Sequence, residues 1–392
     1  MKRATRKMLV ITTAMTGLAV LSTSASAQIA GNEVVTALNA QLALGGASIT
    51  GGNVATSGDS ITITNATLTV SGEDEGVQIS ELKLEGIQET SGGGYTIATA
   101  TVPPFEFSDS GTTATFGAVQ ITNYQIAAPD ETDPILRSGL FDRFTMGPIA
   151  VNVGSQQAFS LAGMIMEIGD YTPGEVWTSS LVAQDFVVNA EAIDDAQTRA
   201  AIAAMGYDDL TGDISMNATW EGQSGALGIQ DFVISVDDAA SIGLDLALGG
   251  YTTDLVEAMQ QINATTQDEQ AASVAMLGLM QQLEIGGAAI TITDASLTNK
   301  VLDFAGQQQG TNAEGMKAFA KGMLPLGLAQ LNAPAFAAEA TAAIGQFLDN
   351  PGKLVLEAKP SAAIPVMQLA GPVMSGNPAQ LIEALSVTIR SE

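Results

Sequence analysis

The stretch ITITNATL, from Ile61 to Leu68, alternates apolar and polar residues and then reverses the alternation after Asn65. Side chains along a strand point to opposite faces in turn, so Ile61 and Ile63 face one side and Ala66 and Leu68 the other unless the register is reset. A β-bulge or tight kink at Asn65 would reset it, because Asn tolerates the backbone angles that such a position requires. The stretch therefore predicts a strand with a bulge, bend or turn at Asn65.

The same pattern recurs along the chain at uneven intervals, which argues against a regular propeller or solenoid. The further copies are VQISELKL from Val77, VQITNYQI from Val119, FSLAGMIM from Phe159, LVAQDFVV from Leu181, LGIQDFVI from Leu227 and ITITDASL from Ile290. Their resets are predicted at Glu81, Asn123, Gly163, Asp185, Asp231 and Asp294. The fold class predicted is α+β: a large antiparallel, bulged and twisted β-sheet region with helices packed on it, and a helix-rich C-terminal third.

The organisation of the chain follows from where this strand pattern gives way to helical spacing. Residues 28–192 are predicted to form an N-terminal β-rich domain. Residues 193–392 are predicted to form an α+β region, with strands in 211–298 and helices with two strands in 299–392; it is either separate or one continuous fold with the first domain. Two helical stripes have the i, i+3, i+4, i+7 spacing of a buried face. They are Met276, Leu279, Met280 and Leu283, and Met316, Phe319, Ala320 and Met323.

Residues 1–27 have the features of a secretory signal peptide. A basic start, MKRATRK, precedes the apolar run MLVITTAMTGLAVL, and the segment ends in Ala25-Ser26-Ala27, a small-residue cleavage site. We expect cleavage and export to the periplasm, with secretion as the alternative. Residues 28–392 hold 10 basic and 42 acidic residues, a net charge of −32. Nucleic-acid binding is not expected, because phosphate backbones are held by patches of Lys and Arg.

Most catalytic and metal-binding chemistry is missing from the composition. The chain contains neither His nor Cys, which excludes a Ser-His-Asp triad, a Cys nucleophile and zinc sites built on those residues. The sequence SELK, from Ser80 to Lys83, has the spacing of a Ser-Lys motif, but it lies in an alternating strand. Paired carboxylates such as Asp208 and Asp209 are expected from the abundance of acidic residues, as caps and turns. We therefore expect a non-enzyme without a cofactor.

Two candidate sites remain. Asp130, Glu131 and Asp133 place carboxylates together on one polar loop, as a calcium site would, although a solvated loop is the simpler interpretation. Trp177 and Trp220 stand next to copies of the repeated pattern. Core packing is the default for each, and the edge of a lipid or peptide groove is the alternative.

Residues 210–250, LTGDISMNATWEGQSGALGIQDFVISVDDAASIGLDLALGG, lay down successive antiparallel strands. In this stretch the chain resembles exported strand-repeat proteins of Gram-negative envelopes, of the uncharacterised YdgA type and more distantly AsmA-like. The resemblance covers about residues 47–298 and implies envelope maintenance or lipid handling in the periplasm. It carries over no catalytic residue. Those proteins are commonly anchored by an N-terminal helix, whereas the segment here ends in a cleavage site.

The function expected from the sequence is a non-catalytic exported envelope protein that binds or scaffolds a lipid or a protein partner and is soluble after signal cleavage. An acidic surface or secreted structural protein, calcium-dependent or not, is the alternative. A carboxylate-based hydrolase is a minor third interpretation.

Overall fold

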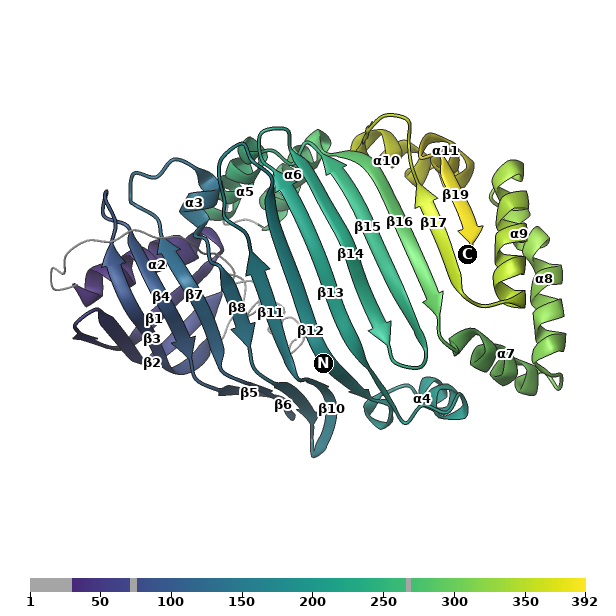
Figure 1. The fold of residues 1–392 in the computed structure, drawn as a ribbon, viewed down its shortest axis with the longest axis horizontal. Coiled ribbons are helices and arrows are strands. Elements are labelled where there is room, and N and C mark those ends of the chain that lie inside the picture. The colour runs from purple at the N-terminus through teal and green to yellow at the C-terminus, as the bar shows by residue number, and fades with distance from the viewer. Residues whose placement is uncertain (1–29, 71–75, 266–268) are drawn as a thin grey trace. The chain divides into compact units, whose positions relative to one another are not determined.

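The computed structural model describes residues 30–70, 76–265 and 269–392 (Figure 1). The predicted signal peptide lies outside these residues. The chain divides into two compact units. The first runs to Gln184 and includes residues 221–223 and 252–279, and the second contains residues 185–220, 224–251 and 280–392. The first unit thus ends at Gln184, whereas the sequence analysis places the boundary after residue 192. Residues 252–279 also belong to the first unit. The α+β class with extensive antiparallel pairing is confirmed.

The first unit is an antiparallel ladder with a shorter branch. The ladder order is β1 (Ala47–Ser57), β2 (Ser60–Val70), β3 (Val77–Glu89), β4 (Tyr95–Val102), β7 (Val119–Ile126), β8 (Arg143–Met146), β11 (Gly163–Ile168) and β12 (Trp177–Asn189), of which the residues up to Gln184 belong to this unit. The branch is β5 (Phe105–Asp109), β6 (Thr112–Phe116), β9 (Ile149–Val153) and β10 (Gln156–Leu161). The helices are α2 (Gly31–Leu44), α3 (Pro134–Ser138), α5 (Thr253–Thr265) and α6 (Glu269–Leu279).

Helix α2 closes the core of this unit. Its Val34 is fully buried, as are Ile61 and Ile63 of β2. The Asn39 side chain replaces a strand neighbour on the outer edge of β1: its Nδ2 donates to the Ile49 carbonyl at 2.9 Å, and its Oδ1 accepts the Ile49 amide at 2.7 Å. Helix α2 is thereby fixed to the sheet by hydrogen bonds as well as by apolar burial, and part of an otherwise unpaired strand edge is satisfied.

The second unit is a meander whose helices follow its strands. The strands are β13 (Asp209–Glu221), β14 (Ala226–Val236), β15 (Ala240–Gly249), β16 (Glu284–Asp294), β17 (Lys353–Ala358), β18 (Ile364–Pro365) and β19 (Val387–Ser391). β14, β15, β16, β17 and β19 pair in that order, and β18 pairs with the start of β16. The helices are α4 (Ala196–Ala204), α7 (Leu297–Gln308), α8 (Ala313–Ala329), α9 (Pro334–Asp349), α10 (Val366–Met374) and α11 (Pro378–Ala384), with 3₁₀ turns at Ala190–Ala192 and Met280–Gln282.

The predicted changes of the buried strand face coincide with unusual backbone geometry at four Asn and Asp positions, which confirms a bend or bulge at each. The backbone is left-handed at Asn65, Asn123, Asp185 and Asp231, with φ between 49° and 57°. Around Asn65 the buried side chains change from Ile61 and Ile63 to Ala66 and Leu68. Asn and Asp tolerate this region of φ better than branched residues do, which is why they occupy these positions.

The resets have two different geometries. Gly52, with φ of 82°, lies opposite Asn65, and the register of β1 with β2 is the same on both sides of the pair. At Asp231 a true bulge places Gln230 and Asp231 opposite the single residue Asp245. The Asp231 amide then donates to the Asp245 carboxylate at 2.9 Å, which satisfies a donor that the bulge removes from the ladder.

The other three predicted positions differ. At Glu81 the prediction of a bulge, bend or turn is wrong: the buried face changes between Ile79 and Leu82, but the pairing with β2 continues without a shift. This stretch lies opposite Asn65, and the left-handed residue of β3 is instead Gly86, with φ of 66°. Gly163 and Asp294 lie at strand ends, Gly163 after a bend at the start of β11 and Asp294 at the end of β16.

Candidate functional site

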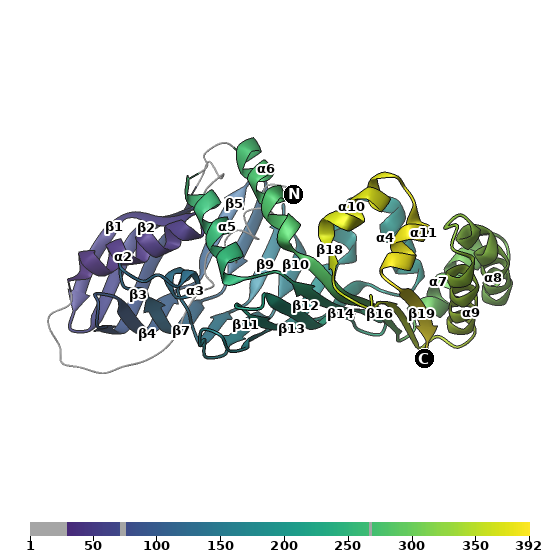
Figure 2. The ribbon, with the colours of Figure 1, turned by 90° about the horizontal axis from the view of Figure 1, so that it is seen from above.

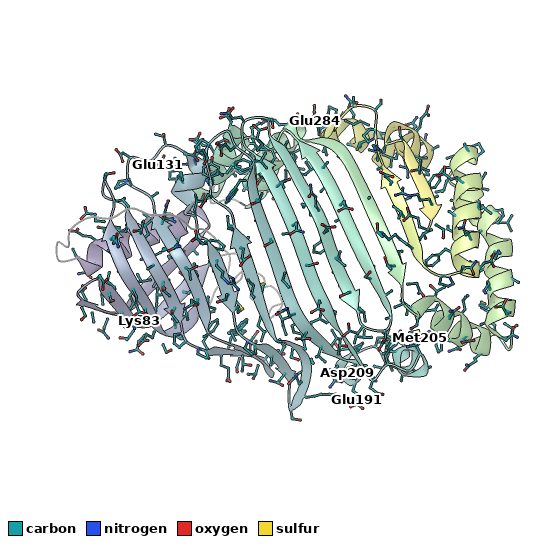
Figure 3. All side chains as sticks on the ribbon, in the orientation of Figure 1. Lys83, Glu131, Glu191, Met205, Asp209 and Glu284 are labelled. Carbon is teal, nitrogen blue, oxygen red and sulfur yellow. The ribbon has the colours of Figure 1, made fainter. Side chains whose placement is uncertain are left out.

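Two carboxylates of the acidic loop in the first unit, those of Glu131 and Asp133, accept backbone amides. Asp133 is the N-cap of α3, where its Oδ1 accepts the amides of Ile135 and Leu136 at 2.8 and 3.3 Å. Its Oδ2 accepts the Tyr171 hydroxyl at 3.0 Å, and burial together with this bond raises the pKa of Tyr171. Glu131, labelled in Figure 3, accepts the amides of Thr132 and Asp133, both at 2.8 Å. Within the described residues, no group of three or more acidic, His or Cys side chains could hold a metal ion.

Replacement of Asp133 by Ala should destabilise the first unit by about 1 kcal/mol, because the amides at the start of α3 lose their acceptor. Asp133→Asn keeps an acceptor and is the matched control. Thermal unfolding in calcium and in chelator measures both effects. We expect the loss to be the same in the two conditions. A calcium-dependent midpoint in the unmodified chain that disappears in Asp133→Ala would contradict this assignment and restore the metal site.

The two tryptophans serve the packing of their own units. Trp177 donates from Nε1 to the Gly169 carbonyl at 2.8 Å, and its ring meets Tyr171 edge-on at 5.5 Å. Trp220 is 6% exposed and donates to the Tyr251 carbonyl at 2.6 Å, with the Tyr251 ring edge-on at 6.3 Å. Buried Trp normally finds such a partner, so the contacts of Trp220 are those of a core residue, while Trp177 is half-buried.

The Ser-Lys spacing of β3 is not arranged for catalysis. Lys83, labelled in Figure 3, forms an ion pair with Glu85 at 2.6 Å. Its hydrogen bond to Glu85 raises the pKa of the Lys83 ammonium. A lysine that acts as a base needs a lowered pKa, because it must be neutral near pH 7.

One face of the sheet in the second unit carries adjacent rows of apolar residues. Ile234 of β14 lies opposite Ile242 of β15, which lies opposite Ile292 of β16. The neighbouring row is Phe232, Leu244 and Ile290. Ile229 and Leu246 form a third pair, because the bulge at Asp231 keeps the apolar residues of β14 on this face. We call these residues the open sheet face: Ile229, Phe232, Ile234, Ile242, Leu244, Leu246, Ile290 and Ile292.

The open sheet face is exposed to an extent unusual for such residues. Ile242 is 56% exposed, and Ile290, Ile234 and Ile292 are 43%, 38% and 36% exposed. None of the residues of β14, β15 or β16 is fully buried. Monomeric proteins rarely expose contiguous apolar patches larger than a few hundred Å², and such patches usually mark binding surfaces.

Helices border this face at the ends of its strands and at its last edge. At one end, Val236 of β14 packs on a cluster that includes Ile202 of α4. At the far edge, Leu354 and Leu356 of β17 pack on Ala340 and Ala343 of α9. Helices α4, α10 and α11 rise from the same side of the sheet, and α9 lies beyond its last strand, as Figure 2 shows. The strands between them, β14 to β16, keep their apolar side chains exposed.

Polar side chains are kept off the open sheet face. The residues that alternate with its members face the opposite side, and their polar side chains include those of Ser241 and Asp245 of β15 and Thr291 of β16. Charged residues lie at the strand ends, Glu284 at one and Glu191 and Asp209 at the other (Figure 3). The backbone groups are engaged in the antiparallel ladder. The face therefore offers apolar contact and almost no hydrogen bonding.

The sequence pattern identifies the residues of the open sheet face only as parts of predicted strands. The alternation in ASIGLDLALG indicates that β15 has an apolar face, but it does not indicate that the face is left exposed. Exposure depends on whether a helix far along the chain packs over the strand, which the local pattern does not encode.

The comparisons with known proteins name no activity for the chain. A family model described as an uncharacterized protein matches residues 233–392, which contain β15 to β19 and α7 to α11. No curated protein matches the chain. No helix in the described part of the chain combines the length and the apolar character needed to cross a bilayer.

Proposed function

We propose that this chain is an exported, non-catalytic envelope protein that binds the apolar part of a lipid on the open sheet face. The observation that carries the proposal is the exposure of Ile242, Ile290, Ile234 and Ile292 in adjacent rows of one face. Covering them with acyl chains would contribute about 0.8 kcal/mol for each CH₂ group removed from water. A ligand spanning several of these side chains would be held firmly.

The chemistry of the face favours a lipid over a protein partner. Its residues are aliphatic apart from Phe232, and they include no Trp, Tyr or Arg, the residues that dominate protein interfaces. A protein partner also brings polar backbone groups, which need hydrogen-bond partners when they are buried. An acyl chain makes no such demand.

The cellular setting proposed is the periplasm. It rests on the signal-peptide features of residues 1–27 and on the resemblance to YdgA-type and AsmA-like envelope proteins, which implies lipid handling. The absence of His and Cys from the composition supports a binding role rather than catalysis.

Lipid extraction of the purified full-length chain, followed by mass spectrometry, tests the proposal directly. We expect co-purified lipid, and saturable binding of a fluorescent fatty acid once that lipid is removed. Competition by unlabelled fatty acid should displace the probe. Finding neither extracted lipid nor saturable probe binding would overturn the proposed function.

A further inference from the structure

A second exposed apolar surface lies on helix α8. The sequence predicts that Met316, Phe319, Ala320 and Met323 form one buried stripe, and for two of them this is wrong: Met316 is 8% exposed, but Phe319 is 55% and Met323 47% exposed. Leu326, one turn further, is 65% exposed. The spacing 319, 323, 326 keeps these side chains on one face of the helix.

Nothing polar interrupts this face. Every exposed residue of α8 from Ala318 to Ala329 is apolar. The larger side chains are those of Phe319, Met323 and Leu326, and the rest are Ala, Gly and Pro. The helix therefore presents several turns of uncharged surface to its surroundings, in a chain that carries 42 acidic and 14 basic residues.

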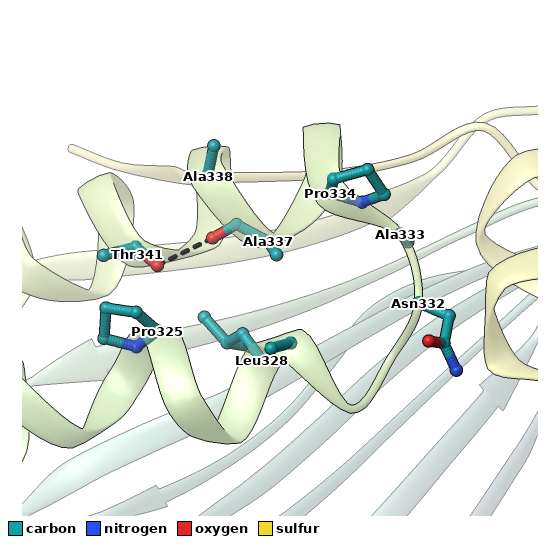
Figure 4. A pocket seen from close by; sticks show the side chains of 9 residues that line it. Pro325, Leu328, Asn332, Ala333, Pro334, Ala337, Ala338 and Thr341 are labelled. Carbon is teal, nitrogen blue, oxygen red and sulfur yellow. Dashed lines mark hydrogen bonds between the residues drawn. The ribbon is translucent and has the colours of Figure 1, made fainter.

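The apolar surface continues from α8 toward α9. A groove of about 470 Å³ lies between the two helices, lined by Pro325 and Leu328 on one side and Ala337, Ala338 and Thr341 on the other (Figure 4). The Thr341 hydroxyl is turned back to the Ala337 carbonyl at 2.7 Å, so the groove remains mainly apolar. We refer to α8 and α9, with the turn between them, as the α8–α9 hairpin.

The hairpin is fixed to the sheet by its other side. Ala340 and Ala343 of α9 pack with Ile389 of β19. Glu339 accepts the Ile389 amide at 2.9 Å, which satisfies a donor on this edge strand. The exposed apolar residues of α8 thus belong to a hairpin whose other helix is fixed to the sheet.

The charges beside the apolar face of α8 indicate which kind of surface the hairpin can bind. Lys317 and Lys321 flank the apolar face, and they form ion pairs with Glu314 at 2.9 Å and with Asp349 at 2.7 Å. The docking face is therefore neutral, while the whole chain is strongly acidic. Helices that lie at a membrane surface have this arrangement, with Phe and Leu on one face and lysines beside it. Anionic lipid would repel the acidic chain, and zwitterionic lipid would not.

We propose that the α8–α9 hairpin docks the protein on a zwitterionic bilayer surface by inserting Phe319, Met323 and Leu326 among the lipid head groups. This docking is separate from occupancy of the open sheet face and does not require it. Because α9 borders that face through Leu354 and Leu356, docking would bring the face close to the bilayer from which a lipid could enter.

The absence of cysteine from the chain allows a site-specific test. Phe319→Cys labelled with an environment-sensitive fluorophore should brighten and shift to the blue when phosphatidylcholine vesicles are added. The same label at Gln308→Cys, an exposed position on α7, is the control and should not respond. An unchanged spectrum at position 319 would overturn the proposal.

Vesicle flotation of the unlabelled chain gives the second measurement. The unmodified protein should float with zwitterionic vesicles, and Phe319→Glu with Leu326→Glu should lower the bound fraction by about tenfold or more. Gln307→Glu with Gln308→Glu makes the same charge change on α7 and should float normally. Ile242→Glu, which alters the open sheet face alone, should also float, so failure of docking and failure of lipid binding are distinguishable. A dimer in light scattering that the α8 variant abolishes, without flotation of the unmodified chain, would assign the hairpin to self-association and refute docking.

Discussion

Glutamate in place of Ile242 should reduce the affinity of the chain for a fluorescent fatty acid by about a hundredfold, while its unfolding midpoint changes little. Ile242 lies in the middle of the open sheet face, between Ile234 and Ile292, and is 56% exposed, so the folded chain tolerates a longer polar side chain there. A bound acyl chain would cover the new carboxylate, and desolvating an unpaired charge costs several kcal/mol. Each 1.4 kcal/mol is a factor of about ten in affinity.

The matched control for Ile242→Glu is Thr293→Glu. Thr293 is exposed, belongs to the adjacent strand β16 and lies opposite Ser241 and Lys353 on the other face of the sheet. Thr293→Glu changes the net charge of the chain by the same amount as Ile242→Glu. It therefore controls for repulsion of the fatty-acid carboxylate by an acidic chain. Probe titration of both variants, with circular dichroism melts to verify folding, makes the comparison. Equal affinities in the unmodified chain and Ile242→Glu would show that the open sheet face is not the binding surface.

One short sequence occurs twice in the chain, and its isoleucines are buried in one copy and exposed in the other. ITIT stands at residues 61–64 in β2 and at 290–293 in β16. Ile61 and Ile63 are fully buried, whereas Ile290 and Ile292 are 43% and 36% exposed. The alternation correctly predicts a strand with an apolar face in both places. Burial of that face is decided by the elements packed over it, and in the second unit the helices border the sheet without covering these strands.

Two residues of the candidate sites named from the sequence illustrate a related limit. Carboxylates and indoles often take part in binding, yet the structure uses Asp133 as a helix cap and Trp220 as a buried donor to a backbone carbonyl. Residue type gives the chemistry that a side chain can perform. Its nearest backbone groups decide whether that capacity is already used, and for both residues it is.

Local backbone geometry was more predictable than exposure. Asn65, Asn123, Asp185 and Asp231 have left-handed φ, and the sequence indicates each one through a reversal of the apolar alternation at a residue that tolerates this geometry. At Glu81 the alternation also reverses, but the residue there has no such tolerance, and the left-handed position of β3 is taken by Gly86. The residue type at the reversal was therefore as informative as the reversal itself.

Replacement of Asn65 by Val should destabilise the first unit by about 1–3 kcal/mol, although Val is the better strand former. With φ of 57°, position 65 holds a conformation that costs an L-residue about 1–2 kcal/mol and is worst for a β-branched side chain. Asn65 is exposed, so the substitution removes no buried contact that would blur the result. Asn65→Gly should change stability by no more than about 0.5 kcal/mol, because Gly adopts positive φ readily.

The opposite strand supplies the control for Asn65→Val. Ser80 of β3 lies opposite Asn65 and is exposed, and its backbone is not left-handed. Ser80→Val should therefore be neutral or slightly stabilising, as expected for an ordinary strand position. Urea unfolding of the three variants and the unmodified chain measures the differences. If Val at position 65 stabilised the chain as Val at position 80 does, then the backbone at Asn65 would be ordinary extended strand, and the change of buried face from Ile63 to Ala66 would need another cause.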